Sequence, residues 1–524
     1  MNPSDTEKRD VRSVYAEGGA EALRNAPTEA WTPKFTSHTT TGNFEQAGTT
    51  ADYIPEDVPP FSHSAKKKVK PFFKYLNNDL GNSELFVARR GDQVRYSPGI
   101  GWLFWNGVIW RPDNLGRVTD IAAKLTHETL KEAAEIEDKD KRDAAVHRAL
   151  RLGDKKVITS MLDLAKGHAA ICTEPSQLNN DPLLIGCQNA VISLTTGQHQ
   201  KPNPDDLITR SLGVAHNPAA TCPRWERFIS EIMLGDEEMI EFLHRAIGYT
   251  LTGEVKEQVF FFLHGNGSNG KSVLVETIRL LLGDYAAKAS RSLLESANPA
   301  QQSENKSDLA RLPGVRLLCA SETRQRGSFN EDLLKDITGG EVVNARALYQ
   351  MPFDFLPCFK IWISGNYRPR IEGTDGGIWR RVRLIPFEAT FTDENKDPDL
   401  AETLKAELPG ILNWAVAGAV KWCRDGLSLP EKVRVAVNEY RDDQDVLGDF
   451  LKERIQESPG TPIKKAIVYA AYRDWCQDNG YKHLLTSHTL SRNMKQRGMD
   501  DGGGHYWRGV RLVESDPFTE EIRR

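Results

Sequence analysis

The chain has 524 residues, a hydrophobic content of 39% and a charged content of 27%, the composition of an ordinary water-soluble protein with several domains. Its formal net charge of −5 excludes a uniformly basic nucleic-acid-binding surface, so any DNA contact must come from local patches. The sequence has neither a long apolar run nor the apolar core of a signal peptide, and its seven cysteines form no C-x-x-C pair. We therefore expect no membrane contact, no zinc ribbon and a cytoplasmic location.

The first 70 residues are rich in Thr, Ser, Ala, Glu and Pro, which predicts a disordered tail. Lysines at positions 66, 67, 68 and 70 close this segment. They would either touch a nucleic-acid backbone or form a solvated linker, and the frequency of such runs at domain edges favours the linker.

Residues 71–235 are predicted to form a mixed α+β domain. Aromatic residues between Trp102 and Trp110 indicate a β-hairpin that turns at Asn106-Gly107. A charged helical stretch follows from Ile121 to Leu164, and a second strand and turn pattern runs from Asn189 to Gln198.

The aromatic residues are interleaved with Arg95 and Arg111. They would either stack on bases or pack against the helices that follow, and we favour packing. The stretch from Pro223 to Gly253 predicts two helices that pack against the next domain.

A nucleotide-binding motif follows an apolar strand, Val259 to Leu263. The sequence GNGSNGKS fits G-x-x-x-x-G-K-[ST] and opens an amphipathic helix that ends near Leu282. Its residues are predicted to hold the phosphates of ATP: Gly265, Asn266, Gly267, Ser268, Asn269, Gly270, Lys271 and Ser272. Lys271 is expected to reach the β- and γ-phosphates and Ser272 to ligate Mg²⁺.

Two further apolar strands end in polar residues. Val315 to Ala320 precedes Ser321-Glu322, where Glu322 is a candidate Mg²⁺ ligand and a candidate base that activates water. Phe359 to Ser364 precedes Gly365-Asn366, where the Asn366 amide would orient the attacking water or sense the γ-phosphate, although Asn at this place is usually a turn residue.

Adjacent arginines, Arg380 and Arg381, precede a last strand in GIWRRVRLIPF. Two neighbouring arginines are weak evidence alone, but an arginine finger that reaches the γ-phosphate of a neighbouring subunit needs such a position.

Together, GNGSNGKS, RLLCASE, KDITGGEVVNARALYQMPFDFLPCFKIWISGN and GTDGGIWRRVRLIPF resemble, in order and spacing, the superfamily 3 helicase domain of the phage and plasmid primase family, which is related to the poxvirus primase-helicases. The resemblance covers roughly residues 70–387. It implies an α/β, P-loop, AAA+-like ATPase core at residues 236–390 that uses ATP and Mg²⁺. Family members form ring hexamers that translocate on single-stranded DNA.

The resemblance also assigns roles to single residues. A β-hairpin between the second and third motifs carries the DNA contacts in the family, and Lys335, Arg346 and Tyr349 fall in or near it. Arg381 is the better candidate for the arginine finger, and Arg380 is the second candidate. Many members have two acids where this chain has Ser321-Glu322, which leaves Mg²⁺ ligation dependent on Ser272 and water.

The remaining chain is predicted to form a helical lid or collar at 391–445, a winged helix at 446–514 and a short tail at 515–524. Thr486 or Ser487 would cap the third helix of the winged helix, which is its candidate recognition helix. Residues 461–513 hold nine Lys or Arg against four Asp, a net charge of +5 that favours DNA binding over protein docking. The candidate DNA contacts are His488, Arg492, Lys495, Arg497, Arg508 and Arg511.

The motifs predict an ATP-driven replicative helicase of a phage or plasmid-type element that acts on single-stranded and forked DNA in a bacterial host cell. The alternative is an origin-binding initiator or loader that uses ATP as an assembly switch. No primase activity is expected, since the sequence before Lys70 is too poor in apolar residues to fold a catalytic domain, and a separate primase or initiator protein would dock instead.

Overall fold

The structure is a computed structural model that describes residues 70–294, 307–321, 328–346, 352–371, 376–460, 462–481, 484–501 and 504–513. Residues 1–69 of the predicted tail 1–70, the predicted tail 515–524 and the candidate residues Glu322 and Tyr349 lie outside these ranges. The chain divides into two compact units after His216.

The first unit begins with a helical and antiparallel β region. The elements are η2 (Phe72–Lys74), α2 (Asp79–Arg90), β1 (Val94–Ser97), β2 (Gly101–Trp105), β3 (Trp110–Pro112), α3 (Arg117–Ala134), α4 (Lys139–Leu152) and α5 (Lys155–Ala165). The predicted hairpin is confirmed, because the Asn106 side-chain oxygen accepts hydrogen bonds from the backbone N–H groups of Val108 and Ile109. Gly107 has a φ of 101°, which an L side chain rarely adopts.

The aromatic side chains of this hairpin pack inside the first unit. Trp105 and Trp110 are buried with Leu103 and Leu178, and Trp102 packs beside Phe86 of α2. The structure therefore supports packing over base stacking for this stretch. A second antiparallel sheet, in the order β4-β5-β6, completes the unit with β4 (Leu184–Gly186), β5 (Val191–Ser193), β6 (His199–Gln200), η3 (Pro175–Gln177) and η4 (Pro204–Asp206).

The second unit is built on a parallel sheet with strand order β13-β7-β12-β9-β8. The strands are β7 (Phe260–His264), β8 (Ala286–Lys288), β9 (Leu317–Ser321), β12 (Lys360–Gly365) and β13 (Val382–Pro386). Alternate side chains of β7 point to opposite faces of the sheet. Phe260 and Phe262 join the core that contains Leu334 and Ile378, whereas the ring centroid of Phe261 lies 6.3 Å from that of Phe242. The sheet is therefore covered on both faces, as parallel sheets usually are.

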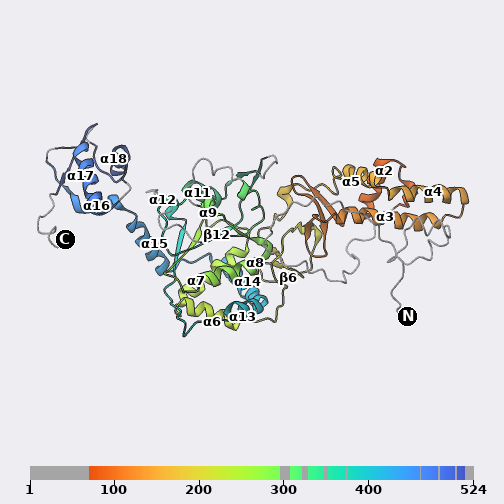
Figure 1. Cartoon of the computed structure of the whole chain (residues 1–524), viewed down its shortest axis with the longest axis horizontal. Helices are drawn as coiled ribbons and strands as arrows, with labels where there is room; N and C mark the ends of the chain where they lie inside the picture. Colours follow the sequence, from red (N-terminus) through yellow and green to blue (C-terminus); the bar gives the residue numbers. More distant parts are fainter. Residues whose placement is uncertain are drawn as a thin grey trace. The chain divides into compact units, whose positions relative to one another are not determined.

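The helices on the two faces come from segments that precede, separate and follow the strands along the chain. On one face lie α7 (Glu237–Leu251), α8 (Lys271–Leu282) and α14 (Leu408–Asp425), which Figure 1 shows close together. The other face carries α11 (Glu331–Gly339), α12 (Gly376–Trp379) and α15 (Glu431–Asp443). The remaining elements of this region are α6 (Pro223–Ile232), η5 (Gly283–Tyr285), α9 (Arg291–Leu294), α13 (Leu400–Ala406) and the antiparallel pair β10 (Val343–Ala345) and β11 (Phe353–Phe355).

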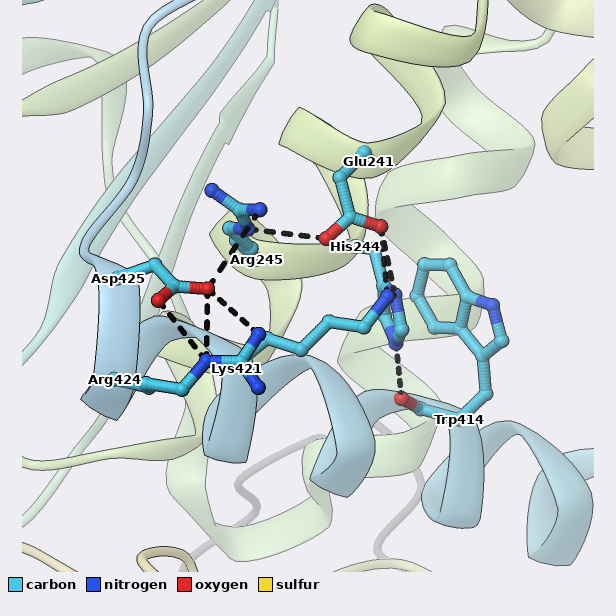
Figure 2. A network of polar contacts seen from close by, with 7 residues as sticks. All are labelled: Glu241, His244, Arg245, Trp414, Lys421, Arg424 and Asp425. Atoms are coloured by element: carbon cyan, nitrogen blue, oxygen red, sulfur yellow. Dashed lines mark hydrogen bonds and ion pairs between the residues drawn. The ribbon is translucent and has the colours of Figure 1, made fainter.

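Helices α7 and α14 cross at close range. A Cβ added to Gly418 would lie 2.2 Å from the His244 carbonyl oxygen, so glycine is needed at this crossing. Polar contacts extend the junction (Figure 2): Lys421 Nζ lies 2.8 Å from Glu241 Oε2, and the His244 ring stacks on Trp414 with 4.2 Å between centroids. The predicted helical region after residue 391 is thus confirmed, and it is packed firmly against the sheet region.

The C-terminal elements are α16 (Val446–Arg454), β14 (Ile455–Glu457), β15 (Ile463–Lys464), α17 (Lys465–Asp478), α18 (Ser487–Gln496), β16 (Tyr506–Trp507) and β17 (Val510–Leu512). Strand β14 pairs with β17, and β15 pairs with β16. Thr486 caps α18 by accepting a hydrogen bond from the Thr489 backbone N–H, as predicted. These elements share one apolar core that includes Phe450, Tyr472 and Trp507.

Candidate functional site

The glycines of the loop between β7 and α8 are required by its geometry. A Cβ on Gly265 would lie 2.4 Å from both the Asn269 amide nitrogen and the Phe387 carbonyl oxygen. Gly267 and Gly270 have φ values of 99° and 85°. The motif thus forms a tight loop between a buried strand and a helix N-terminus, an arrangement that suits an anion.

Lys271 is folded back onto this loop. Its ammonium group donates to the carbonyl oxygen of Gly265 at 2.7 Å and to the side-chain oxygen of Asn269 at 2.9 Å. The side chain is only 4% exposed, and burial lowers the pKa of Lys271 to about 8. Ser272 follows at the start of α8 and is exposed, so its hydroxyl is accessible to an ion.

The ends of three neighbouring strands meet beside the loop. Strand β12 lies between β7 and β9, so Gly365 pairs with His264 and Ser364 with Ser321. Asn366 therefore follows β12 directly beside the phosphate loop, and it is exposed. Crevices at the carboxyl ends of parallel strands are the usual ligand sites of such sheets.

A cavity of about 880 Å³ opens in front of this loop. Lys271, Ser272 and Asn366 all line it. Its opposite wall comes from α6 and from residues between Phe391 and Ala401, so segments on both sides of the motif in sequence build the site.

The wall formed by α6 was not predicted as part of the site. Arg224 lies 3.2 Å from both Glu231 and Asp397, and so joins α6 to the 391–401 segment. The Phe391 backbone N–H donates to the Ser268 carbonyl oxygen at 2.7 Å, which ties the same segment to the phosphate loop. No local sequence signal marks the Arg224–Asp397 and Phe391–Ser268 contacts, because their partners are more than a hundred residues apart.

The two candidate arginine fingers differ in their surroundings. Arg381 is 7% exposed, and its guanidinium donates to the Thr338 hydroxyl at 3.1 Å and to the Gly377 carbonyl oxygen at 2.7 Å. Arg380 is exposed. A side chain held inside its own subunit cannot reach a neighbour without breaking these bonds, so Arg380 is the more accessible of the two, and the assignment of the finger stays a prediction.

The candidate DNA-contacting residues of the second unit lie on different elements. Lys335 is on α11, 4.0 Å from Glu331, rather than on the β10–β11 hairpin. Arg346 is exposed directly after β10. The hairpin expected between the second and third motifs is present, and its DNA contacts stay a prediction.

The basic residues of the C-terminal elements are exposed but not equivalent. The Arg497 guanidinium donates two hydrogen bonds to the Asp445 carboxylate, and the Lys495 ammonium lies 3.0 Å from the Asp501 carboxylate. Arg492, Arg508 and His488 are exposed, and Arg492 makes no ion pair with another described residue. Arg511 donates to Gln456 across β14 and β17. Arg492 and Arg508 are thus the better-placed candidates, whereas Arg497 holds α18 to the start of α16.

The described ranges contain no group of three or more His, Cys, Asp or Glu side chains placed to hold a metal ion. None of their helices has both the length and the apolar character that crossing a membrane requires.

Three protein-family models match parts of the chain. The model described as D5 N terminal like matches residues 83–234, a family of unknown function (DUF5906) matches residues 263–381, and the model described as poxvirus D5 protein-like matches residues 442–509.

Curated relatives come from large DNA viruses. One is described as a helicase of Acanthamoeba polyphaga mimivirus, with 29% identity over 59% of this chain and 35% of the relative. A second, described as a helicase of Frog virus 3, is 30% identical over 47% of this chain and 27% of the relative. A third, described as a primase of African swine fever virus, is 26% identical over 58% of this chain and 34% of the relative.

The chain spans roughly a quarter to a third of the length of each of these three relatives. Among solved structures, the apo C-terminal region of NrS-1 is similar, with 13% identity, a TM-score of 0.40 and coverage of 68% of this chain and 89% of that chain. The resemblance to the primase-helicases that the motifs predicted is confirmed by the D5-type matches at both ends and by the viral relatives.

Proposed function

Because the chain resembles D5-type primase-helicases, we propose that it is the motor of a replicative DNA helicase, an α/β ATPase of the P-loop, AAA+-like type that hydrolyses ATP with Mg²⁺. The observation that carries this proposal is the meeting of Lys271, Ser272 and Asn366 around one cavity at the carboxyl ends of β7 and β12. The placement of β12 between the phosphate-loop strand and β9 supports it, since Glu322 directly follows β9.

The proposed chemistry uses one residue for each task. The loop N–H groups and Lys271 bind the β- and γ-phosphates. The Ser272 hydroxyl would hold Mg²⁺, which would offset the negative charge of the phosphates. Asn366 orients a water molecule, and Glu322 takes its proton while the water oxygen attacks the γ-phosphorus. The bond to the bridging oxygen breaks, and ADP and inorganic phosphate leave. In the proposed ring of six subunits, which is the assembly that the family resemblance implies, Arg380 of a neighbour stabilises the transferred phosphate.

Two other parts of the chain would bind DNA. The β10–β11 hairpin, followed by Arg346, is the proposed contact with single-stranded DNA. The order helix, strand, strand, helix, helix, strand, strand after residue 446, with β14 paired to β17 and β15 paired to β16, supports a winged helix whose exposed Arg492 and Arg508 bind duplex DNA. A separate primase or initiator protein is a proposed partner, and the first unit is its proposed docking region.

The test is strand displacement on a forked duplex with ATP, in which we compare the intact chain with Lys271→Ala. The intact chain should separate the strands, and Lys271→Ala should not, because the phosphates lose their cation. The matched control is Lys288→Ala, which removes an exposed lysine from the edge strand β8. ATP-dependent duplex binding without strand separation by the intact chain would favour the initiator alternative.

A further inference from the structure

A second cavity of about 700 Å³ lies on the other side of the phosphate loop. Its wall includes the first half of the loop, Gly265 to Gly267, and the side chain of Arg368. Gly267 and Asn269 line both cavities, so the two meet at the loop itself. Arg368 comes two residues after Asn366, and none of the motifs singled it out.

The guanidinium of Arg368 is only partly engaged. Nη1 lies 2.6 Å from a carboxylate oxygen of Asp443 on α15, and the guanidinium carbon lies 5.8 Å from the centroid of the Tyr440 ring. Nε is buried and makes no hydrogen bond within the described residues. The Asp443 side chain is 62% exposed, so the carboxylate that pairs with Arg368 is well solvated. Another anion can therefore replace it as the partner of the guanidinium.

The positive charge of Arg368 acts on the base of the phosphate loop. His264 is the last residue of β7, directly before Gly265. Burial lowers the pKa of His264 to about 4, and the charges of Arg368 and Lys271 contribute to the same shift. Arg368 and Lys271 therefore act on one small region from two sides.

A nucleotide in the first cavity would have a defined direction. With the phosphates over the loop N–H groups, the nucleoside would lie toward the wall formed by α6 and residues 395–401. The terminal phosphate then points away from α6, toward Asn366 and the first half of the loop. Arg368 stands at that end.

We propose that Arg368 binds the γ-phosphate of ATP in its own subunit and exchanges Asp443 for that phosphate when ATP enters. A phosphate accepts two parallel hydrogen bonds from a guanidinium, which would also give the Nε–H group a partner. ADP lacks this phosphate, so Arg368 would distinguish the two nucleotides. The inference rests on the proposed nucleotide site.

The test measures dissociation constants of the full chain, with Mg²⁺, for ADP and for the non-hydrolysable analogue adenosine β,γ-imidotriphosphate. Arg368→Gln should weaken binding of the triphosphate about 10- to 100-fold, the effect of one lost charge-assisted pair, and leave binding of ADP within about two-fold. Arg368→Lys keeps the charge without the paired geometry and should fall between the two. Arg370→Gln is the matched control, since Arg370 lies in the same segment and lines neither cavity.

Asp443→Asn separates phosphate binding from a purely structural role. If Arg368 only anchored α15, Asp443→Asn would weaken nucleotide binding as Arg368→Gln does, and that result would overturn the inference. We expect instead that Asp443→Asn keeps or tightens triphosphate binding, because it releases the guanidinium. Equal changes for ADP and the triphosphate in Arg368→Gln would also overturn it. Failure of the intact chain to bind either nucleotide would refute the proposed function itself.

Discussion

The Lys271 ammonium lies 2.7 Å from the carbonyl oxygen of Gly265, the first residue of its own loop. The lysine that the motif assigns to the phosphates is thus held inside the loop, together with the Asn269 side chain. A nucleotide must replace these two hydrogen bonds with phosphate oxygens. The exchange is favourable because a charge-assisted bond to phosphate is stronger than one to a neutral carbonyl.

The first prediction concerns the pH dependence of nucleotide binding. Burial lowers the pKa of Lys271 to about 8 in the free protein, and bound phosphate should raise it, so binding favours the protonated form. Affinity for ADP should therefore fall as pH rises above 8, by about ten-fold for each pH unit. Titrations from pH 7 to pH 9.5 check this. Lys271→Arg, which stays charged, should remove the dependence, and a flat profile for the intact chain would contradict the prediction.

The second prediction separates the two adjacent arginines. Arg381→Ala should lower the free energy of unfolding by about 2–4 kcal/mol, since the Thr338 hydroxyl and the Gly377 carbonyl lose a buried partner. Arg380→Ala should preserve stability and ATP binding but reduce ATP hydrolysis. Chemical denaturation and steady-state ATPase assays measure these effects.

Mixing provides the control for this assignment. A Lys271→Ala chain still offers Arg380, and an Arg380→Ala chain still offers its phosphate loop, so ATPase activity should return when subunits exchange. Arg381→Ala, under conditions in which it stays folded, should hydrolyse ATP without mixing, because it keeps both Lys271 and Arg380. An inactive, folded Arg381→Ala chain that recovers activity when mixed with Lys271→Ala would restore Arg381 as the finger.

The third prediction concerns Lys360, the first residue of β12 and 1% exposed. Its ammonium donates to the carbonyl oxygens of Thr252, Glu254 and Cys358. Lys360→Met should lower the free energy of unfolding by about 2–4 kcal/mol because these acceptors lose their donor. Lys396→Met, at an exposed position, is the control for urea denaturation. Equal stability of the two variants would show that water replaces the ammonium.

The fourth prediction concerns duplex DNA. Arg492→Ala should weaken binding and reduce the salt slope by about one, because one phosphate contact is lost. Arg497→Ala should instead lower the melting temperature, since Arg497 pairs with Asp445. Binding titrations at several salt concentrations and thermal unfolding distinguish the two. A larger loss of DNA affinity in Arg497→Ala would reverse the assignment.

The sequence predicted the parts of this protein whose geometry is local. The glycines of GNGSNGKS, the turn at Asn106-Gly107 and the cap at Thr486 each follow from what a few neighbouring residues permit. The apolar strands and helices around the loop also lie where their periodicity predicted them. The order of these motifs was sufficient to indicate the primase-helicase resemblance.

The tertiary structure decided which of several similar side chains is available for function. Arg380 and Arg381 are neighbours in the chain, yet only packing against Thr338 and Gly377 makes one of them internal. Arg497 is engaged because Asp445 reaches it across 52 positions of sequence, and Arg224 and Arg368 enter the cavities through folding alone. Burial and ion pairing depend on groups brought together from distant segments, and no local spacing in a sequence encodes that proximity.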